Sequence, residues 1–156
     1  MIQINPAALP QHLDLVRRLF RDYAASLPVS LDFQDFDSEL AALPGDYQPP
    51  GGRLLLAWHE DQAVGCVALR PLERGICEMK RLYVTPAARA TGLGRRLAER
   101  ICSEARAAGY LRMRLDTLAS MSVARRVYRS LGFRGIDPYC FNPLPDAVFL
   151  ELDLTQ

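Results

Sequence analysis

Two glycines at the expected start of a helix are the residues whose types and spacing most directly indicate chemistry. The segment Arg89-Ala90-Thr91-Gly92-Leu93-Gly94 follows a strand that is expected to end at Val84. The first turn of a helix carries unpaired backbone N–H groups and about half a positive charge. Glycine lets an anion approach these groups without meeting a β-carbon. With Arg89 and Arg95 beside it, this turn is predicted to bind a phosphate or pyrophosphate.

Two common nucleotide-binding turns do not fit this spacing. A dinucleotide fingerprint needs G-x-G-x-x-G directly after a strand, but seven residues separate Val84 from Gly92 and Leu97 replaces the third glycine. A Walker loop needs Gly-Lys-Ser/Thr, whereas Gly94 is followed by two arginines. Taken alone, the glycine pair also fits a helix start with a purely structural role.

The elements that position this turn follow from changes in the hydrophobic period. Helical spacing predicts helices over residues 10–27, 33–43, 92–108 and 120–131. Alternation and short apolar runs predict strands over residues 2–4, 53–59, 63–69, 76–84, 111–117 and 147–154. Because no repeat or long linker divides the sequence, we expect one domain over residues 1–156. Its fold class is predicted to be α+β with a mostly antiparallel sheet.

Alternation along residues 76–84 is expected to place four side chains on one face, those of Glu78, Lys80, Leu82 and Val84. The same rule, applied to residues 111–117, places Arg112, Arg114 and Asp116 opposite the apolar side chains. The final strand over residues 147–154 offers an edge that could pair with a second copy of the chain in a homodimer.

Two segments resemble the signatures of the GNAT N-acetyltransferase superfamily. Val84-Thr85-Pro86, followed by the turn at residues 89–94, resembles its Arg/Gln-x-x-Gly-x-Gly/Ala signature. Ala124, Tyr128 and Gly132-Phe133 resemble its second signature. The resemblance implies a GNAT-like fold with a central mixed, mostly antiparallel sheet of about six to seven strands and helices on both faces. Asp116-Thr117-Leu118, with Met121 and residues 138–143, resembles a bacterial subgroup of undefined acceptor.

The resemblance implies a role for each matched residue. The CoA pyrophosphate would lie on the turn formed by Arg89, Ala90, Thr91, Gly92, Leu93 and Gly94, with Arg95 beside it, and the pantetheine arm would pair with the main chain of Leu82, Tyr83 and Val84. Glu78 matches the general base, and Tyr128 matches the acid that protonates the departing thiolate. A base is needed because an alkyl ammonium of pKa about 10 is protonated at neutral pH.

The implied reaction moves an acetyl group from acetyl-CoA to a primary amine of a small molecule or peptide, by direct attack in a ternary complex. The acceptor is expected to enter between the N-terminal helices and residues 139–145, with Phe33, Phe36 and Tyr139 as wall residues. The alternative is a non-catalytic GNAT-fold module that binds or senses acyl-CoA, and a longer acyl donor fits the sequence equally well.

Other interpretations of the same residues stay open. Glu78 beside Lys80 also fits a plain ion pair, since perturbed carboxylates have both origins. Tyr128 also fits a core aromatic whose hydroxyl needs a partner. Met121 occupies a position where many GNAT members carry an asparagine that contacts the cofactor, so a neighbouring serine or water would substitute.

Composition limits the remaining function classes. Apolar residues make up 49% of the 156 residues and charged residues 24%, the usual balance of a soluble globular protein. A formal net charge of +1 gives no long-range attraction for nucleic acid or an anionic membrane. With no long apolar run and no signal-like start, the cytoplasm is the expected location. Cys66, Cys77 and Cys102 are predicted to be buried free thiols. His12 and His59 lack supporting ligands at metal-site spacing, so no metal is expected.

Overall fold

The computed structural model covers residues 1–156 and contains one seven-stranded sheet. The strands are ordered β1-β2-β3-β4-β5-β7-β6, and only β4 and β5 are parallel neighbours. Their bounds are β1 Ile2–Pro6, β2 Arg53–His59, β3 Gln62–Glu73, β4 Ile76–Val84, β5 Arg112–Leu118, β6 Arg134–Gly135 and β7 Ala147–Asp153. The predicted α+β fold with a mixed, mostly antiparallel sheet is therefore confirmed.

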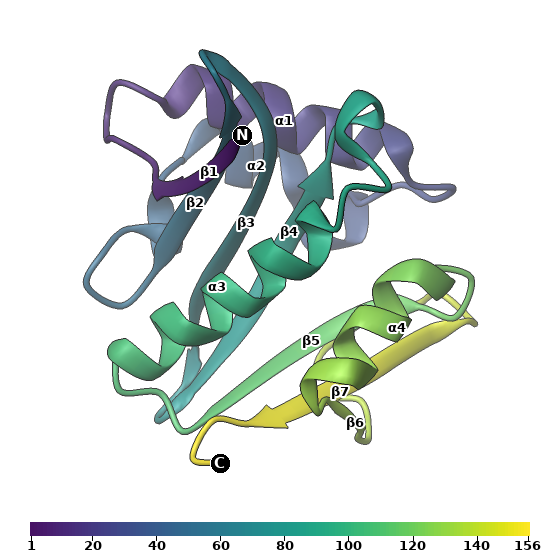
Figure 1. The fold of residues 1–156 in the computed structure, drawn as a ribbon. Coiled ribbons are helices and arrows are strands. Elements are labelled where there is room, and N and C mark those ends of the chain that lie inside the picture. Colours follow the sequence, from purple (N-terminus) through teal and green to yellow (C-terminus); the bar gives the residue numbers. More distant parts are fainter.

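Helices cover both faces of the sheet. On one face lie α1 (Leu13–Ser26) and α2 (Phe36–Ala41), and on the other lie α3 (Leu93–Ala107) and α4 (Ser122–Leu131) (Figure 1). Each face has its own buried apolar cluster, and the neighbouring strand residues Leu55 and Leu56 belong to opposite clusters, as the period of two requires. None of the helices is both long enough and apolar enough to cross a membrane.

Three sequence-based boundaries differ from the structure. The helix predicted over residues 33–43 is divided into a short 3-10 turn (Asp32–Gln34) and α2, because Asp35 between them has a φ of 55°. Strand β3 extends past Leu69 to Glu73, so the hairpin with β4 turns at Arg74 and Gly75 instead of residues 71–75. The two-residue strand β6, which the sequence pattern did not predict, pairs with β7. Because β6 pairs with Leu150 and Glu151, β7 is not the outermost strand that was predicted, and β1 and β6 form the edges; the homodimer stays a prediction.

A bulge in β4 overturns the predicted face of its second half. Cys66 of β3 pairs with Tyr83 and Ala68 pairs with Lys80, so two residues of β4 lie opposite Val67 alone. Arg81, one of those two, has a φ of 62°. A bulge of this kind inserts one residue and reverses the alternation beyond it. Tyr83 consequently joins the core beneath α1 and α2, while Leu82 and Val84 pack on the α3 and α4 side, away from the Glu78 face.

Strands β4 and β5 pair over three residues and then separate. Their parallel register runs only from Ile76 with Arg112 to Glu78 with Arg114. From Met79 onward β4 has no strand partner on this side, and Figure 1 shows the two strands diverging towards the N-terminal end of α3. The sheet therefore opens in its middle, and residues from both of its faces can border the space between the strands.

Candidate active site

A pocket that is partly open to solvent lies where β4 and β5 separate. The side of α3 and α4 contributes Met79, Leu82, Leu115, Ala124 and Tyr128 to its wall. The opposite side contributes Tyr23, Phe33, Gln34, Lys80 and Asp116, with Asn142 from the loop before β7. The pocket thus passes between the strands and meets both faces of the sheet.

The N-terminus of α3 leaves main-chain N–H groups free where the anion cradle is predicted. Gly92 precedes the helix with a φ of 80°, and no side chain caps the first turn. The first hydrogen bond of the helix runs from Arg96 N to Gly92 O at 3.2 Å, which leaves the N–H groups of residues 93–95 without helical acceptors. A β-carbon on Gly94 would meet only Val84 Cγ2, at 3.9 Å, so packing inside the protein does not require a glycine there.

The side chains of the cradle are engaged with the protein itself. Arg89 Nε donates to Val84 O at 3.1 Å, and its guanidinium lies 5.9 Å from the ring centre of Tyr83. Thr91 Oγ1 donates to Ala88 O at 2.6 Å. Arg95 pairs with Glu99 at 2.7 Å and also contacts Ser130. These contacts leave anion binding at this turn chiefly to backbone N–H groups.

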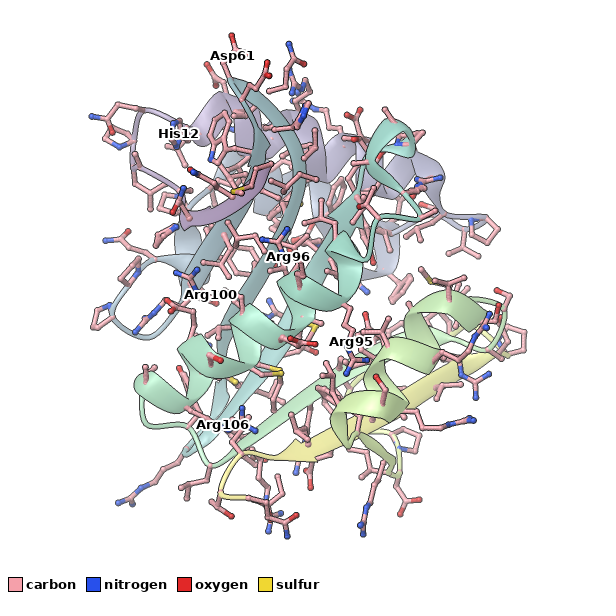
Figure 2. The ribbon with its side chains drawn as sticks, in the orientation of Figure 1. His12, Asp61, Arg95, Arg96, Arg100 and Arg106 are labelled. Carbon is pink, nitrogen blue, oxygen red and sulfur yellow. The ribbon has the colours of Figure 1, made fainter.

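The arginines that follow along α3 fasten the helix to its surroundings. Figure 2 shows Arg95 between α3 and α4, whereas Arg96 and Arg100 lie on the β1 side. Arg96 donates to Ile2 O at 3.0 Å, and Arg100 donates to Ile4 O at 3.1 Å. Leu93 is buried, so it anchors the first turn of the helix in the core. The turn at residues 89–94 is therefore anchored on both sides, to the end of β4 through Arg89 and to the core through Leu93 of α3.

Tyr128 reaches the pocket from α4. Its ring packs against Phe133 with centroids 5.6 Å apart, and the residue is only 7% exposed. Its hydroxyl forms no hydrogen bond within the protein, although the ring borders the pocket. Burial raises the pKa of Tyr128, so the phenol stays protonated at neutral pH and can donate a proton.

Glu78 lies beneath the pocket, outside its wall. The residue is 2% exposed, and both carboxylate oxygens are occupied. Arg70 Nε donates to Oε1 at 2.9 Å, and the Tyr139 hydroxyl donates to Oε2 at 2.7 Å. The ion pair that the sequence left open is therefore present, but its partner is Arg70 and not Lys80.

Three charged residues that were not singled out as site residues line the pocket: Arg81, which is paired with Glu39, and Lys80 and Asp116, which form no ion pair. Lys80 Nζ donates to Gln34 Oε1 at 3.0 Å, and Asp116 Oδ2 accepts from Asn142 Nδ2 at 3.0 Å. Alternation had already placed Asp116 on the polar face of its strand and Lys80 on the face of Glu78. The sequence does not show where β4 and β5 separate. This separation brings Lys80 and Asp116 to the same pocket.

The expectation for the wall residues needs correction. Of the three predicted wall residues, only Phe33 borders the pocket; the guanidinium of Arg81 covers the ring of Phe36 at 5.0 Å, and Tyr139 packs on Phe149 beside Glu78. Met121 lines the pocket, and Thr117 Oγ1 contacts its sulfur at 3.7 Å. As predicted, three cysteines are buried and free, namely Cys66, Cys77 and Cys102, while Cys140 is exposed.

Comparison with known proteins identifies the family of the chain. A sequence model of the acetyltransferase (GNAT) family matches residues 14–133. An uncharacterized N-acetyltransferase of Schizosaccharomyces pombe is 41% identical over 157 residues, covering 99% of this chain and 96% of the relative. Because that relative comes from a fission yeast, the expected restriction to a bacterial subgroup is not supported.

Solved structures share the fold. A GNAT-family acetyltransferase from Staphylococcus aureus Mu50 superimposes with a TM-score of 0.79 at 20% identity, covering 99% of both chains. A putative acetyltransferase from Salmonella typhimurium, solved with its cofactor acetyl-CoA, superimposes with a TM-score of 0.73 at 21% identity, covering 98% of this chain and 94% of that chain. The extent of the family match and the identity to the yeast relative show that this chain belongs to the GNAT acetyltransferase family.

Proposed function

We propose that the protein transfers an acetyl group from acetyl-CoA to a primary amine of a small molecule or peptide, by direct attack in a ternary complex. The observation that carries the proposal is the pocket between β4 and β5, whose wall combines residues from both faces of the sheet. A donor held on the side of α3 and α4 and an acceptor entering beneath α1 and α2 could meet there. Residues 1–156 would act as one domain.

The donor would be held mainly by main-chain groups. The N–H groups of residues 93–95 suit a pyrophosphate, and the absence of a side chain at Gly94 leaves room for it. No strand pairs with the β4 edge at Leu82, Tyr83 and Val84, although Arg89 occupies Val84 O, and this edge suits the amide groups of a pantetheine arm, since an extended ligand can pair with a strand edge. Acetyl-CoA supplies the activated thioester; the protein supplies alignment, which lowers the barrier by removing the entropic cost of an encounter.

Proton transfer is assigned to a carboxylate and a phenol. Glu78 is proposed as the base, because the family signature places a glutamate there. Asp116 is the competing carboxylate, because it borders the pocket whereas Glu78 is covered by Arg70 and Tyr139. Tyr128 is proposed as the acid for the departing thiolate, which its protonated state at neutral pH and its place in the pocket support. Each proton transfer of this kind contributes about 10²–10⁴-fold to the rate.

A panel of primary amines with acetyl-CoA tests the proposal, with free thiol release as the readout. Release that depends on protein, acetyl-CoA and amine together is the expected result, and mass spectrometry should find the acetylated amine. Propionyl-CoA in a parallel series compares acyl chain lengths. Tight CoA binding without any amine-dependent thiol release would contradict the proposal and favour a non-catalytic module that binds or senses acyl-CoA.

A further inference from the structure

Lys80 is a buried ammonium group without a carboxylate partner. It is the only lysine of the chain, and the residue is 8% exposed. None of the ion pairs within 4.0 Å includes it. The side chain of Gln34 accepts one hydrogen bond from Nζ. An ammonium has three donors, so two of them are free of protein side-chain acceptors.

The other buried charges on this strand are paired. Glu78 is matched by Arg70 at 2.9 Å, and Arg81 by Glu39 at 2.8 Å. Burying a charge without an opposite charge is costly, and proteins usually avoid it. Burial lowers the pKa of Lys80; the charge of Arg81 acts in the same direction, while the charges of Glu78 and Asp116 oppose the shift.

Asp116 supplies the opposite charge on the other side of the same pocket. It lies on β5, and its only hydrogen-bond donor closer than 3.5 Å is the neutral amide of Asn142. No arginine, lysine or histidine pairs with it within 4.0 Å. A cation on β4 and an anion on β5 therefore border one space without neutralising each other.

Both charges face the acceptor side. Lys80 contacts Gln34, which lies just before α2, and Asp116 contacts the loop before β7. The anion cradle at the N-terminus of α3 lies on the opposite side, so the phosphates of the donor would be served there. The rest of the acceptor side is largely apolar, with Leu27, Val29 and Leu31 in its wall.

We infer that the acceptor is a zwitterion like an apolar amino acid, whose carboxylate pairs with Lys80 and whose ammonium group is placed beside Asp116. This inference rests on the proposed acetyl transfer and narrows its substrate class. The apolar wall then contacts the side chain of the acceptor, and the carboxylate gives the buried ammonium the partner that the protein does not provide.

Matched pairs of acceptors separate this class from other amines. Leucine with leucinamide, and phenylalanine with phenylalaninamide, differ only in the carboxylate. We expect kcat/KM for thiol release to be at least about tenfold higher for the acid than for the amide, the effect of a charged hydrogen bond. The amide carries the less basic and more readily deprotonated amine, so intrinsic reactivity works against this result.

Two variants test the residue that sets the preference. Lys80→Gln removes the ammonium, and Gln34→Glu gives it a carboxylate partner within the protein, which it would share with Arg81, since Arg81 Nη1 also donates to Gln34 Oε1 at 2.9 Å. Both should bring the acid-to-amide ratio towards one, while CoA binding and the melting temperature report that the fold is retained. Gln34→Asn, which keeps a neutral amide, is the matched control and should preserve the preference.

Three results would count against the inference. A preference for the amides, or an acid preference that both variants leave intact, contradicts the role of Lys80. Thiol release with simple alkylamines but with none of the amino acids contradicts the acceptor class while leaving acetyl transfer in place. If no amine causes thiol release, the result contradicts the proposed acetyl transfer and therefore also the proposed acceptor class.

Discussion

The hydroxyl of Tyr139 donates a hydrogen bond to Glu78 Oε2 at 2.7 Å, and so fastens the loop before β7 to the middle of β4. The other carboxylate oxygen accepts from Arg70 at 2.9 Å. Burial and the adjacent carboxylate raise the pKa of Tyr139, so this phenol remains a donor across the physiological range. A carboxylate held in this way has two functions open to it, anchoring the loop or accepting a proton after a small rearrangement.

Replacing the carboxylates of Glu78 and Asp116 one at a time distinguishes loop anchoring by Glu78 from proton acceptance. Under the proposed mechanism, Glu78→Gln lowers kcat by about 100-fold or more at neutral pH and leaves CoA binding unchanged. The loss should shrink as pH rises, because the amine then loses its proton to solvent. The measurement is a pH–rate profile of thiol release for the wild type, Glu78→Gln and Asp116→Asn.

Tyr139→Phe is the matched control for the same experiment, since it removes the hydrogen bond and keeps the carboxylate. In Tyr139→Phe the rate should still fall at low pH as it does in the wild type, because Glu78 remains present to accept the proton. Unchanged turnover of Glu78→Gln across the pH range, with a loss in Asp116→Asn, would transfer the role of base to Asp116 and leave Glu78 as a positioning residue.

The phenol of Tyr128 is tested by its removal. Tyr128→Phe should lower kcat by about 10²–10⁴-fold with little effect on stability, because the hydroxyl has no hydrogen-bond partner in the protein to lose. Tyr47→Phe is a suitable control, since this second buried hydroxyl also has no partner and lies outside the pocket. Equal kcat values for the two variants would remove Tyr128 from the role of acid.

Gly94 offers a test of the cradle that is separate from catalysis. Gly94→Ala should raise helix stability by about 0.5–1 kcal/mol, since alanine is the better helix former and no protein atom lies closer than 3.9 Å to its β-carbon. The same β-carbon should weaken CoA binding by about tenfold, roughly 1.4 kcal/mol. Calorimetric titration with CoA measures this, with the distant Gly135→Ala as control. Unaltered CoA affinity in Gly94→Ala would place the phosphates elsewhere.

The parts of the site that depend on local sequence were predictable. Gly92 has a φ of 80° and precedes an amphipathic helix, so its type and position predict the helix start at which the cradle is proposed. The alternating strands also revealed which side chains face the core. Both signals involve residues that are close together in the chain, where the period and the steric demands of each residue determine the outcome.

The bulge at Arg81 could not be predicted in the same way. No glycine marks its φ of 62°; the conformation is held by Glu39, whose two oxygens accept hydrogen bonds from Arg81 at 2.9 and 2.8 Å across 42 positions of sequence. Because the bulge reverses the alternation, it also determines which residues of β4 face each side of the pocket. The local conformation of Arg81 thus depends on a long-range ion pair with Glu39, which the alternation of side chains along β4 cannot predict.

The pair formed by Arg81 and Glu39 should therefore matter for stability more than other ion pairs. Glu39→Ala leaves a guanidinium of 2% side-chain exposure without a carboxylate partner, since only the neutral amide of Gln34 still accepts a hydrogen bond from it, and we expect a loss of about 3–5 kcal/mol in the free energy of unfolding. Asp14→Ala, which breaks the exposed pair with Arg17, should change it by less than about 1 kcal/mol. Urea denaturation measures both. Similar values for the two variants would show that Glu39 does not hold the bulge.

Alkaline pH should reveal the buried thiol of Cys66. Burial raises its pKa from 9.0 to about 12, and its Sγ donates to Arg81 O at 3.3 Å. The unfolded chain releases this proton first, so the stabilisation is complete below pH 9 and is lost as pH rises from 9 towards 12. The contribution of Cys66 to the slope is about 1.4 kcal/mol per pH unit in that window.

Urea denaturation at pH 8, 9 and 10 measures this slope for the wild type and for Cys66→Ala. The variant should be less stable at pH 8, because it leaves a small cavity in a filled core, but its stability should fall less steeply above pH 9. The difference between the two slopes isolates the thiol, since every other titrating group is present in both proteins. Parallel curves would mean that the thiol ionises as readily in the folded chain as in the unfolded one, which its burial beneath Arg81 argues against.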